Sequence, residues 1–152
     1  GFIFIGLIKV GDDPKVIEYN VRMGDPETEV VLPRIKNDLV HLFKSVAEGT
    51  LHEVTLEIDS KSAVTVVAVS EGYPEAYEKS MEIYGLDQEA ESTVFHSGTV
   101  LDGNRKRTNG GRVLAVTSFG NNYQEALKKS YNTLKGITYT GIHYRKDIGF
   151  DL

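Results

Sequence analysis

Two β-rich runs separated by a turn open the chain, and they constrain its fold more than any other feature. Residues 2–10 and 15–21 are rich in β-branched and aromatic side chains, and turn-forming residues fill the gap between them, Gly11-Asp-Asp-Pro14. This pattern predicts an antiparallel hairpin. Apolar side chains occupy both alternating sets of positions in residues 2–10, so we expect this strand to be covered on both faces.

The second run carries polar side chains on one of its faces. Alternate side chains share a face of a strand, so Glu18 and Asn20 project from a common surface. A carboxylate and an amide oxygen two residues apart suit Mg²⁺, which leaves its other positions to water and substrate phosphates. Arg22 follows with the same parity, and its planar guanidinium suits a phosphate or a carboxylate. The opposite face is apolar and is expected to face the core: Ile17, Tyr19 and Val21.

A simpler interpretation of these residues stays open. Half-exposed strands commonly alternate apolar and polar residues, so Glu18, Asn20 and Arg22 can equally form a solvated strand face. Asp25, which precedes a proline, is typical of a helix N-cap. Glu27 in the first helical turn would complement the helix dipole.

The remainder of the first third predicts a kinked helix. Pro33 should kink or restart the helix that begins after Asp25. Apolar residues then recur at helical spacing from Ile35 to Val46, and Gly49 is a natural C-terminal stop. The polar stretch 50–62 predicts a boundary between two domains, residues 1–52 and residues 53–152.

The second domain is expected to mix strands with one helix. Asn122 with Glu125 three residues later resembles a capping box, and it predicts a helix that ends at Gly136. Its apolar stripe runs to Leu134. Short β-like pieces are expected in residues 139–152. The expected strands are residues 63–69, 93–101 and 112–119, with the polar stretch 102–111 joining the last two. The predicted fold class is therefore α/β (α+β), with antiparallel strands and a kinked helix followed by a small mixed lobe.

Composition excludes several classes of function. The net charge of -5 gives no general attraction to nucleic acid, and the only local basic run, Arg105 to Arg107, is short. No segment approaches the roughly 20 apolar residues of a membrane helix. The chain has no cysteine, which excludes thiolate metal sites and agrees with a cytoplasmic protein. We expect His96 to be a hydrogen-bonded structural residue, and Arg145 and Asp147 to form an exposed ion pair.

One long stretch, VIEYNVRMGDPETEVVLPRIKNDL from Val16 to Leu39, closely resembles the phosphoribosylamine-glycine ligases, also called glycinamide ribonucleotide synthetases, of the ATP-grasp superfamily. Its core, Arg22-Met-Gly-Asp-Pro-Glu27, is much more specific than the Glu-x-Asn pair alone. Three later segments match in order: Phe95 to Thr99, Gly110 to Thr117, and Tyr144 to Gly149. The match of the last segment implies that Arg145 and Asp147 instead pin the C-terminal lobe. The resemblance covers essentially the whole chain but only the C-terminal third or so of such an enzyme.

The resemblance implies an ATP-dependent carboxylate-amine ligase of purine biosynthesis. In these enzymes ATP phosphorylates glycine, and the amine of 5-phosphoribosylamine attacks the resulting glycyl phosphate to give glycinamide ribonucleotide. By resemblance, Glu18 and Asn20 hold Mg²⁺ or Mn²⁺, Arg22 is a catalytic residue that stabilises a phosphate, and Asp25 and Glu27 bind substrate. Many ATP-grasp enzymes have another acidic metal ligand on the preceding strand; residues 2–10 contain none, so a second metal ion is not expected.

The resemblance also makes the chain part of a larger enzyme. Residues 1–52 would be the end of the ATP-grasp domain and residues 53–152 the C-terminal lobe, with the substrate-binding N-terminal domain and the nucleotide-clamping lobe preceding Gly1. The chain alone is therefore predicted not to turn over ATP, and its expected partner is that missing N-terminal portion. Two alternatives stay open: a non-catalytic α+β binding or structural module, and another ATP-grasp carboxylate-amine ligase with a different acyl acceptor.

Overall fold

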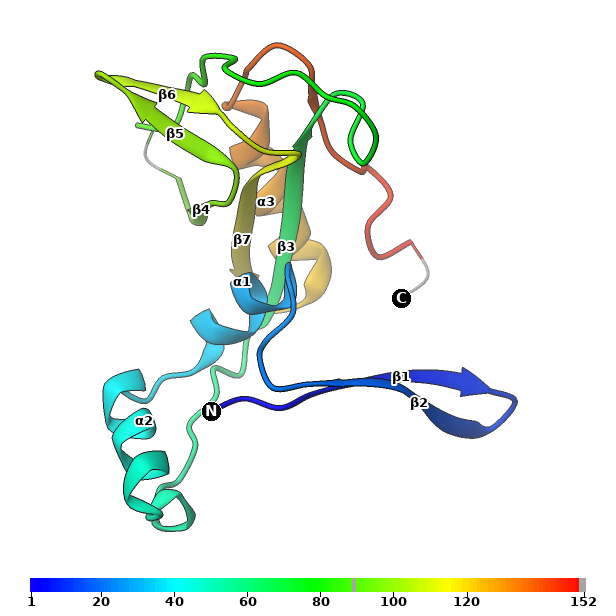
Figure 1. Cartoon of the computed structure of the whole chain (residues 1–152), viewed down its shortest axis with the longest axis vertical. Helices are drawn as coiled ribbons and strands as arrows, with labels where there is room; N and C mark the ends of the chain where they lie inside the picture. The colour runs from blue at the N-terminus through cyan, green and yellow to red at the C-terminus, as the bar shows by residue number, and fades with distance from the viewer. Residues whose placement is uncertain (89, 151–152) are drawn as a thin grey trace. The chain divides into compact units, whose positions relative to one another are not determined.

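The chain folds into two compact units, which are Gly1–Asp59 and Ser60–Leu152. A computed structural model describes residues 1–88 and 90–150 (Figure 1). The mixed α/β class with antiparallel strands is confirmed. The sequence had suggested a domain boundary between residues 52 and 53, whereas the two units divide between residues 59 and 60.

The predicted hairpin is confirmed in the first unit. Strands β1 (Phe4–Val10) and β2 (Asp13–Asn20) pair in antiparallel fashion (Figure 1). Gly11 occupies the turn with a φ of 62°, a conformation that glycine adopts without steric cost. The strand pairing thus fixes which residues of β1 lie opposite the polar residues of β2.

The expected cover on the hairpin is absent from the described residues. β1 and β2 form a sheet of only two strands, and the apolar face of β2 is exposed rather than packed into a core. Ile17 and Tyr19 on this face are 64% and 68% exposed, and Val21 just beyond the strand is 90% exposed. The prediction that this face lies against a core is therefore wrong for the chain as described. The exposed apolar side chains of this region are Ile3, Ile5, Leu7, Ile8, Val10, Val16, Ile17, Tyr19 and Val21.

Pro33 interrupts the helical region, as predicted. The short helix α1 (Glu27–Val31) continues into a 3-10 turn, η1 (Leu32–Arg34), and a new helix, α2 (Leu39–Glu48), begins after an extended link. Pro26 is the N-cap of α1, so Asp25 lies one residue outside the helix and is not its N-cap residue. That part of the sequence interpretation is wrong.

Helix α2 has well-defined ends. The side chain of Asp38 accepts a hydrogen bond of 2.9 Å from the backbone N–H of His41, which satisfies one of the free amides of the first turn. Gly49 ends the helix in the left-handed conformation with a φ of 74°, as predicted. A second 3-10 turn, η2 (Leu51–Glu53), follows.

The second unit is built on a four-stranded antiparallel sheet in the order β4-β7-β3-β8. A long helix, α3 (Tyr123–Lys135), runs along β3 and β7 (Figure 1). A separate antiparallel pair, β5-β6, completes the unit. The strands are β3 (Ser62–Ser70), β4 (Ser92–His96), β5 (Thr99–Asp102), β6 (Arg105–Thr108), β7 (Arg112–Gly120) and β8 (Ile142–His143).

The strand expected over residues 93–101 is in fact two strands of different sheets. The chain bends at Gly98, where an added Cβ would lie 2.3 Å from the carbonyl oxygen of Arg112 and 2.8 Å from Cα of Gly110. Only a residue without a side chain fits this approach. The polar stretch that follows contains β6, a strand that the sequence analysis missed because its side chains are mostly charged.

Helix α3 is capped as predicted and covers the main core. The Asn122 side chain accepts a hydrogen bond of 2.9 Å from the backbone N–H of Glu125, while the Glu125 carboxylate accepts one from the N–H of Asn121. The hydrogen bond from the Asn121 N–H, together with the ammonium group of Lys129, holds the pKa of Glu125 below its usual value. The buried core lies between the helix and the sheet and includes Val66, Ala68, Ile83, Val113, Leu114, Val116, Leu134, Ile137 and Tyr139. Among the described residues, no helix combines the length and the apolar character needed to cross a membrane.

Candidate functional site

Glu18 and Asn20 lie side by side on one face of β2. The side-chain amide of Asn20 donates a hydrogen bond of 3.0 Å to Oε1 of Glu18. Glu18 is exposed and Asn20 is half-buried. The strand therefore presents the carboxylate and the amide in the same direction. This arrangement is the one that strand alternation predicts, and a shared metal ion requires it.

The donor set of this pair fits a hard cation. In residues 1–88 and 90–150, Oε2 of Glu18 and Oδ1 of Asn20 accept no hydrogen bond, so both oxygens are available as ligands. Oxygen ligands of this kind, supplemented by water and phosphate, are those that Mg²⁺ and Mn²⁺ prefer. The described chain supplies no cluster of three or more acidic or histidine side chains that could hold an ion by itself. The pair is thus suited to half of a site whose other ligands come from elsewhere.

Arg22 lies just beyond the end of β2 and is exposed. One of its terminal nitrogens donates a hydrogen bond of 3.1 Å to the carbonyl oxygen of Met23. Because the guanidinium has five N–H donors, this single bond leaves several for an anion. Within the part of the chain that the structure describes, Arg22 forms no hydrogen bond with Glu18 or Asn20, and its side chain is not buried.

The turn from Gly24 to Glu27 places the side chain of Glu27, a predicted substrate-binding residue, over the backbone of Gly24. The carboxylate of Glu27 lies over Gly24, where an added Cβ would be only 2.1 Å from Oε2. The carbonyl oxygen of Gly24 in turn accepts hydrogen bonds from the backbone N–H and the hydroxyl of Thr28, at 3.1 and 2.6 Å. Glu27 is half-buried and Asp25 is exposed. The structure thus places the Glu27 carboxylate over Gly24 at the start of α1.

Two glycines next to the predicted site residues were not recognised as important from the sequence. Gly24 makes room for Glu27, and Gly6 on β1 lies directly opposite Glu18. The available signal for Gly6 was its place as an isolated glycine inside an otherwise apolar strand pattern, which often marks a bulge or a close approach of another group. Gly24 was part of the Arg22 to Glu27 motif, but its own role was not inferred.

The other candidate residues have local structural roles. Nδ1 of His96 lies 2.9 Å from the hydroxyl of Thr99, so His96 is hydrogen-bonded, as predicted. Arg145 and Asp147 form a two-point ion pair, with distances of 2.9 and 3.0 Å, on exposed side chains. The Arg145 guanidinium holds the pKa of Asp147 below its usual value.

The short basic run lies on β6, and each of its three side chains is paired with a carboxylate. Arg105 lies 3.4 Å from Glu82, and Arg107 lies 2.9 Å from Asp102. Lys106 is paired with Asp87. These pairs offset much of the positive charge that a phosphate backbone would attract.

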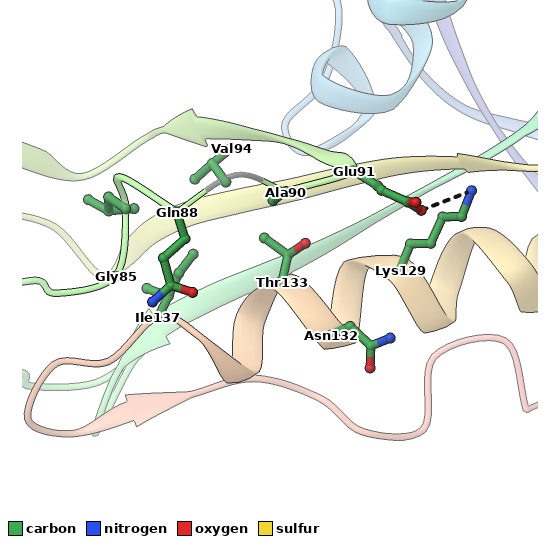
Figure 2. A pocket seen from close by; sticks show the side chains of 10 residues that line it. Gly85, Gln88, Ala90, Glu91, Val94, Lys129, Asn132, Thr133 and Ile137 are labelled. Atoms are coloured by element: carbon green, nitrogen blue, oxygen red, sulfur yellow. Dashed lines mark ion pairs between the residues drawn. The ribbon is translucent and has the colours of Figure 1, made fainter.

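The second unit contains a half-open recess with a volume of about 380 Å³ between β4 and α3 (Figure 2). Its lining is mixed: Leu86, Val94 and Ile137 are apolar, whereas Gln88, Asn132 and Thr133 are polar. At its rim, Lys129 forms an ion pair of 3.3 Å with Glu91 and a second one of 3.2 Å with Glu125, so its charge is shared between two carboxylates. The residues predicted to bind metal or substrate lie in the first unit and do not line this recess.

A comparison with protein-family models identifies the second unit. Residues 63–151, more than half of the chain, match the family described as phosphoribosylglycinamide synthetase, C domain.

Relatives extend this similarity over almost the whole chain. A phosphoribosylamine-glycine ligase of Caldanaerobacter subterraneus subsp. tengcongensis is 41% identical over 148 residues, which cover 97% of this chain and 36% of the relative. The ligase of Halalkalibacterium halodurans is 45% identical over 150 residues, with coverage of 98% and 35%. The crystal structure of the Thermotoga maritima ligase matches with a TM-score of 0.78 and 35% identity, and covers 97% of this chain and 36% of that one. The chain therefore spans about a third of the length of these relatives.

Proposed function

Because the chain belongs to the phosphoribosylglycinamide synthetase family through its C domain, we propose that it is the C-terminal part of a phosphoribosylamine-glycine ligase. The observation that carries this proposal is the similarity to such ligases along 97% of the chain, including the segment with Glu18 and Asn20. The side-by-side geometry of these two residues adds independent support, since it suits a metal-phosphate site.

The proposed reaction is the ATP-dependent joining of glycine to 5-phosphoribosylamine. A carboxylate oxygen of glycine attacks the γ-phosphorus of ATP, the bond to the β-phosphate oxygen breaks, and ADP leaves. The amine of 5-phosphoribosylamine then attacks the acyl carbon of glycyl phosphate, the acyl C–O bond breaks, and phosphate leaves as the new amide nitrogen loses a proton. The products are glycinamide ribonucleotide, ADP and phosphate.

In this reaction Glu18 and Asn20 would hold Mg²⁺ or Mn²⁺ through Oε2 and Oδ1. When bound, the ion would neutralise charge on the transferred phosphate. The hydrogen bond between the two side chains would keep both oxygens directed to the same side of β2. Arg22 would donate its remaining N–H groups to a phosphate oxygen, and we assign it the catalytic role on that basis.

Asp25 and Glu27 are proposed to bind substrate. Glu27 suits this role because its half-buried carboxylate lies over Gly24 at the start of α1. Both acids could accept hydrogen bonds from an amino group, such as that of glycine. Residues 1–52 are accordingly proposed to be the end of an ATP-grasp domain, and residues 53–152 the C-terminal lobe.

The exposed apolar surface of the hairpin indicates that the first unit has a binding partner. Its strands expose large apolar side chains on both faces, whereas monomeric proteins rarely leave so continuous an apolar surface in water. We propose that the remaining, N-terminal portion of the ligase covers this surface and supplies the ATP-clamping groups. The chain alone would then be inactive. A cytoplasmic location belongs to the same proposal, and the absence of cysteine agrees with it.

A chimera tests this function directly. The chain would replace the matching segment of the Caldanaerobacter ligase, and ADP release would be measured with and without glycine and freshly generated 5-phosphoribosylamine. We expect ADP release that requires both substrates. The variants Glu18→Ala and Asn20→Ala should abolish it, whereas Glu57→Gln, which changes an exposed carboxylate elsewhere in the first unit, should not.

Three results would contradict the proposal in different ways. A folded chimera that releases no ADP would favour a non-catalytic module. Release that depends on another acid or amine would identify a different ATP-grasp ligase. Full activity after Glu18→Ala would remove the metal role of that residue while leaving the family function intact.

A further inference from the structure

Gly6 and Glu18 occupy directly opposite positions on the two strands of the hairpin. The side-chain stem of Glu18 passes over Gly6 so closely that an added Cβ would lie 3.2 Å from Cγ of Glu18. The same Cβ would lie 3.7 Å from the backbone nitrogen and oxygen of Glu18. Cγ of Glu18 therefore occupies space that a side chain at position 6 would crowd.

The pairing of the two strands changes at this point. Gly6 pairs with Glu18, but the next residue, Leu7, pairs with Val16, so Ile17 has no partner on β1. An unpaired residue of this kind is a β-bulge, which bends the strand and re-aims the neighbouring side chains. The bulge lies immediately before Glu18, so it affects the direction in which this carboxylate leaves the sheet.

The backbone conformation does not explain why position 6 is a glycine. Gly11 in the nearby turn has a φ of 62°, which disfavours other residues, but Gly6 is not among the glycines with positive φ. An alanine could adopt the backbone conformation of Gly6 without strain. Space is the remaining constraint on a side chain at this position, and the nearest atom in that space belongs to Glu18.

We propose that Gly6 is a positioning residue of the metal-binding pair: its missing side chain leaves room for the conformation in which Glu18 meets Asn20. The role toward metal rests on the proposed function, since it is there that Glu18 and Asn20 act as ligands. An alanine at position 6 would displace Cγ of Glu18 by a few tenths of an ångström. That displacement turns the carboxylate away from the Asn20 amide and separates the two ligand oxygens.

The contact can be tested in this chain without any metal. NMR spectra of Gly6→Ala would be compared with those of the natural chain for the Glu18 χ1 couplings and the side-chain amide signals of Asn20. We expect both to change in Gly6→Ala, and to change further in Gly6→Val. The control is Gly1→Ala, because a Cβ at Gly1 has no atom within 4 Å. Unchanged couplings and amide signals in Gly6→Ala would overturn the proposal.

Gly6→Ala could also unpair the two strands of the hairpin, and a double variant tests that case. Cross-strand contacts between Phe4 and Asn20 report whether the two strands remain paired. If they disappear, the double variant Gly6→Ala with Glu18→Ala removes the crowded side chain. Restored pairing in the double variant would support crowding by Glu18 as the cause, and failure to restore it would overturn the proposal.

A second measurement separates the role of Gly6 from the metal role of the pair. Mn²⁺ alone is added to the chain, and paramagnetic broadening is followed at Glu18 and Asn20. We expect Gly6→Ala to lower the apparent affinity for Mn²⁺, measured from this broadening, by about tenfold. That is the lower end of the range for residues that orient metal ligands. Unchanged Mn²⁺ affinity in that variant would overturn the positioning role. Absence of localised broadening in the natural chain would count against the proposed metal role alone, because the couplings test the contact with Gly6 independently.

Discussion

Asn20 donates a side-chain hydrogen bond of 3.0 Å to Glu18 across one face of β2. This bond uses the amide nitrogen and one carboxylate oxygen, and it leaves one oxygen of each residue for another ligand. The pair therefore has the polarity of a cation site, with one full negative charge supplied by Glu18.

Glu18→Gln is expected to lower the affinity of the chain for Mn²⁺ by at least about tenfold, because it removes that charge while keeping the size of the side chain. Titration followed by paramagnetic broadening of the backbone signals of β2 measures the change. Glu57→Gln is the matched control, since Glu57 is also an exposed carboxylate of the first unit. Equal losses in the two variants would mean that Mn²⁺ responds only to overall charge.

A buried cluster of hydroxyl groups ties α3 to the sheet of the second unit. Ser118 on β7 is fully buried, and its Oγ lies 2.6 Å from that of Ser92 and 2.8 Å from that of Ser130. Ser118→Ala would remove both of these hydrogen bonds, while Ser92 would keep its bond to Thr133 and Ser130 its bond to Val64. We expect the free energy of unfolding to fall by about 1–3 kcal/mol, measured by urea denaturation. Ser97→Ala, on an exposed residue, should change it little; a similar loss there would argue against the hydroxyl cluster as the cause.

The sequence predicted elements whose ends are set by local chemistry. Gly49 ends α2 and Asn122 caps α3, because a left-handed glycine and a capping side chain act within a few residues. The hairpin was predicted for the same reason. Local chemistry also indicated that Glu18 and Asn20 share a face, since that follows from strand alternation alone.

Features that depend on distant contacts could not be predicted in this way. The division at Gly98 results from the approach of Gly110 and Arg112, which lie more than ten residues later in the sequence. Strand β6 is charged because its side chains pair with acids such as Glu82, so its pattern resembles that of a loop. Asp25 is a different case, because its misinterpretation involved local chemistry. Its residue type suits a cap, but the helix begins one residue later than a cap at Asp25 requires. The space above Gly6 likewise appears only when the two strands are paired.

The hydroxyl of Tyr139 makes the stability of the second unit depend on pH in the alkaline range. Tyr139 is buried in the core and donates a hydrogen bond of 2.9 Å to the carbonyl oxygen of Val69. Burial raises the pKa of this hydroxyl above its ordinary value, so the folded state holds the proton more tightly than the unfolded state does. The resulting stabilisation is complete below the unfolded pKa of about 10 and is lost as the pH rises from there toward the folded pKa.

The destabilisation caused by Tyr139→Phe should therefore be larger near pH 7 than above about pH 10. Near pH 7 the substitution should lower the free energy of unfolding by about 1 kcal/mol, because the hydrogen bond to Val69 is lost. Above about pH 10 the difference from the natural chain should shrink, because phenylalanine has no proton to lose. Urea denaturation at both pH values measures the change. Tyr84→Phe, on an exposed tyrosine, should behave as the natural chain does; a constant deficit for Tyr139→Phe at all pH values would contradict the linkage.

The exposed apolar hairpin leads to a prediction about assembly. Ile3 is 75% exposed beside β1, and Val40 is 76% exposed on α2, so the two residues offer similar apolar surface in different places. If the remainder of the ligase covers the hairpin, Ile3→Ser should weaken binding of the chain to a separately produced N-terminal portion of the Caldanaerobacter ligase. Burial of one such side chain contributes about 1.5–3 kcal/mol, so the dissociation constant should rise by about tenfold or more. Calorimetric titration measures it, and Val40→Ser is expected to bind as the natural chain does. Equal weakening by the two variants, or none by Ile3→Ser, would mean that the partner covers some other surface of the first unit.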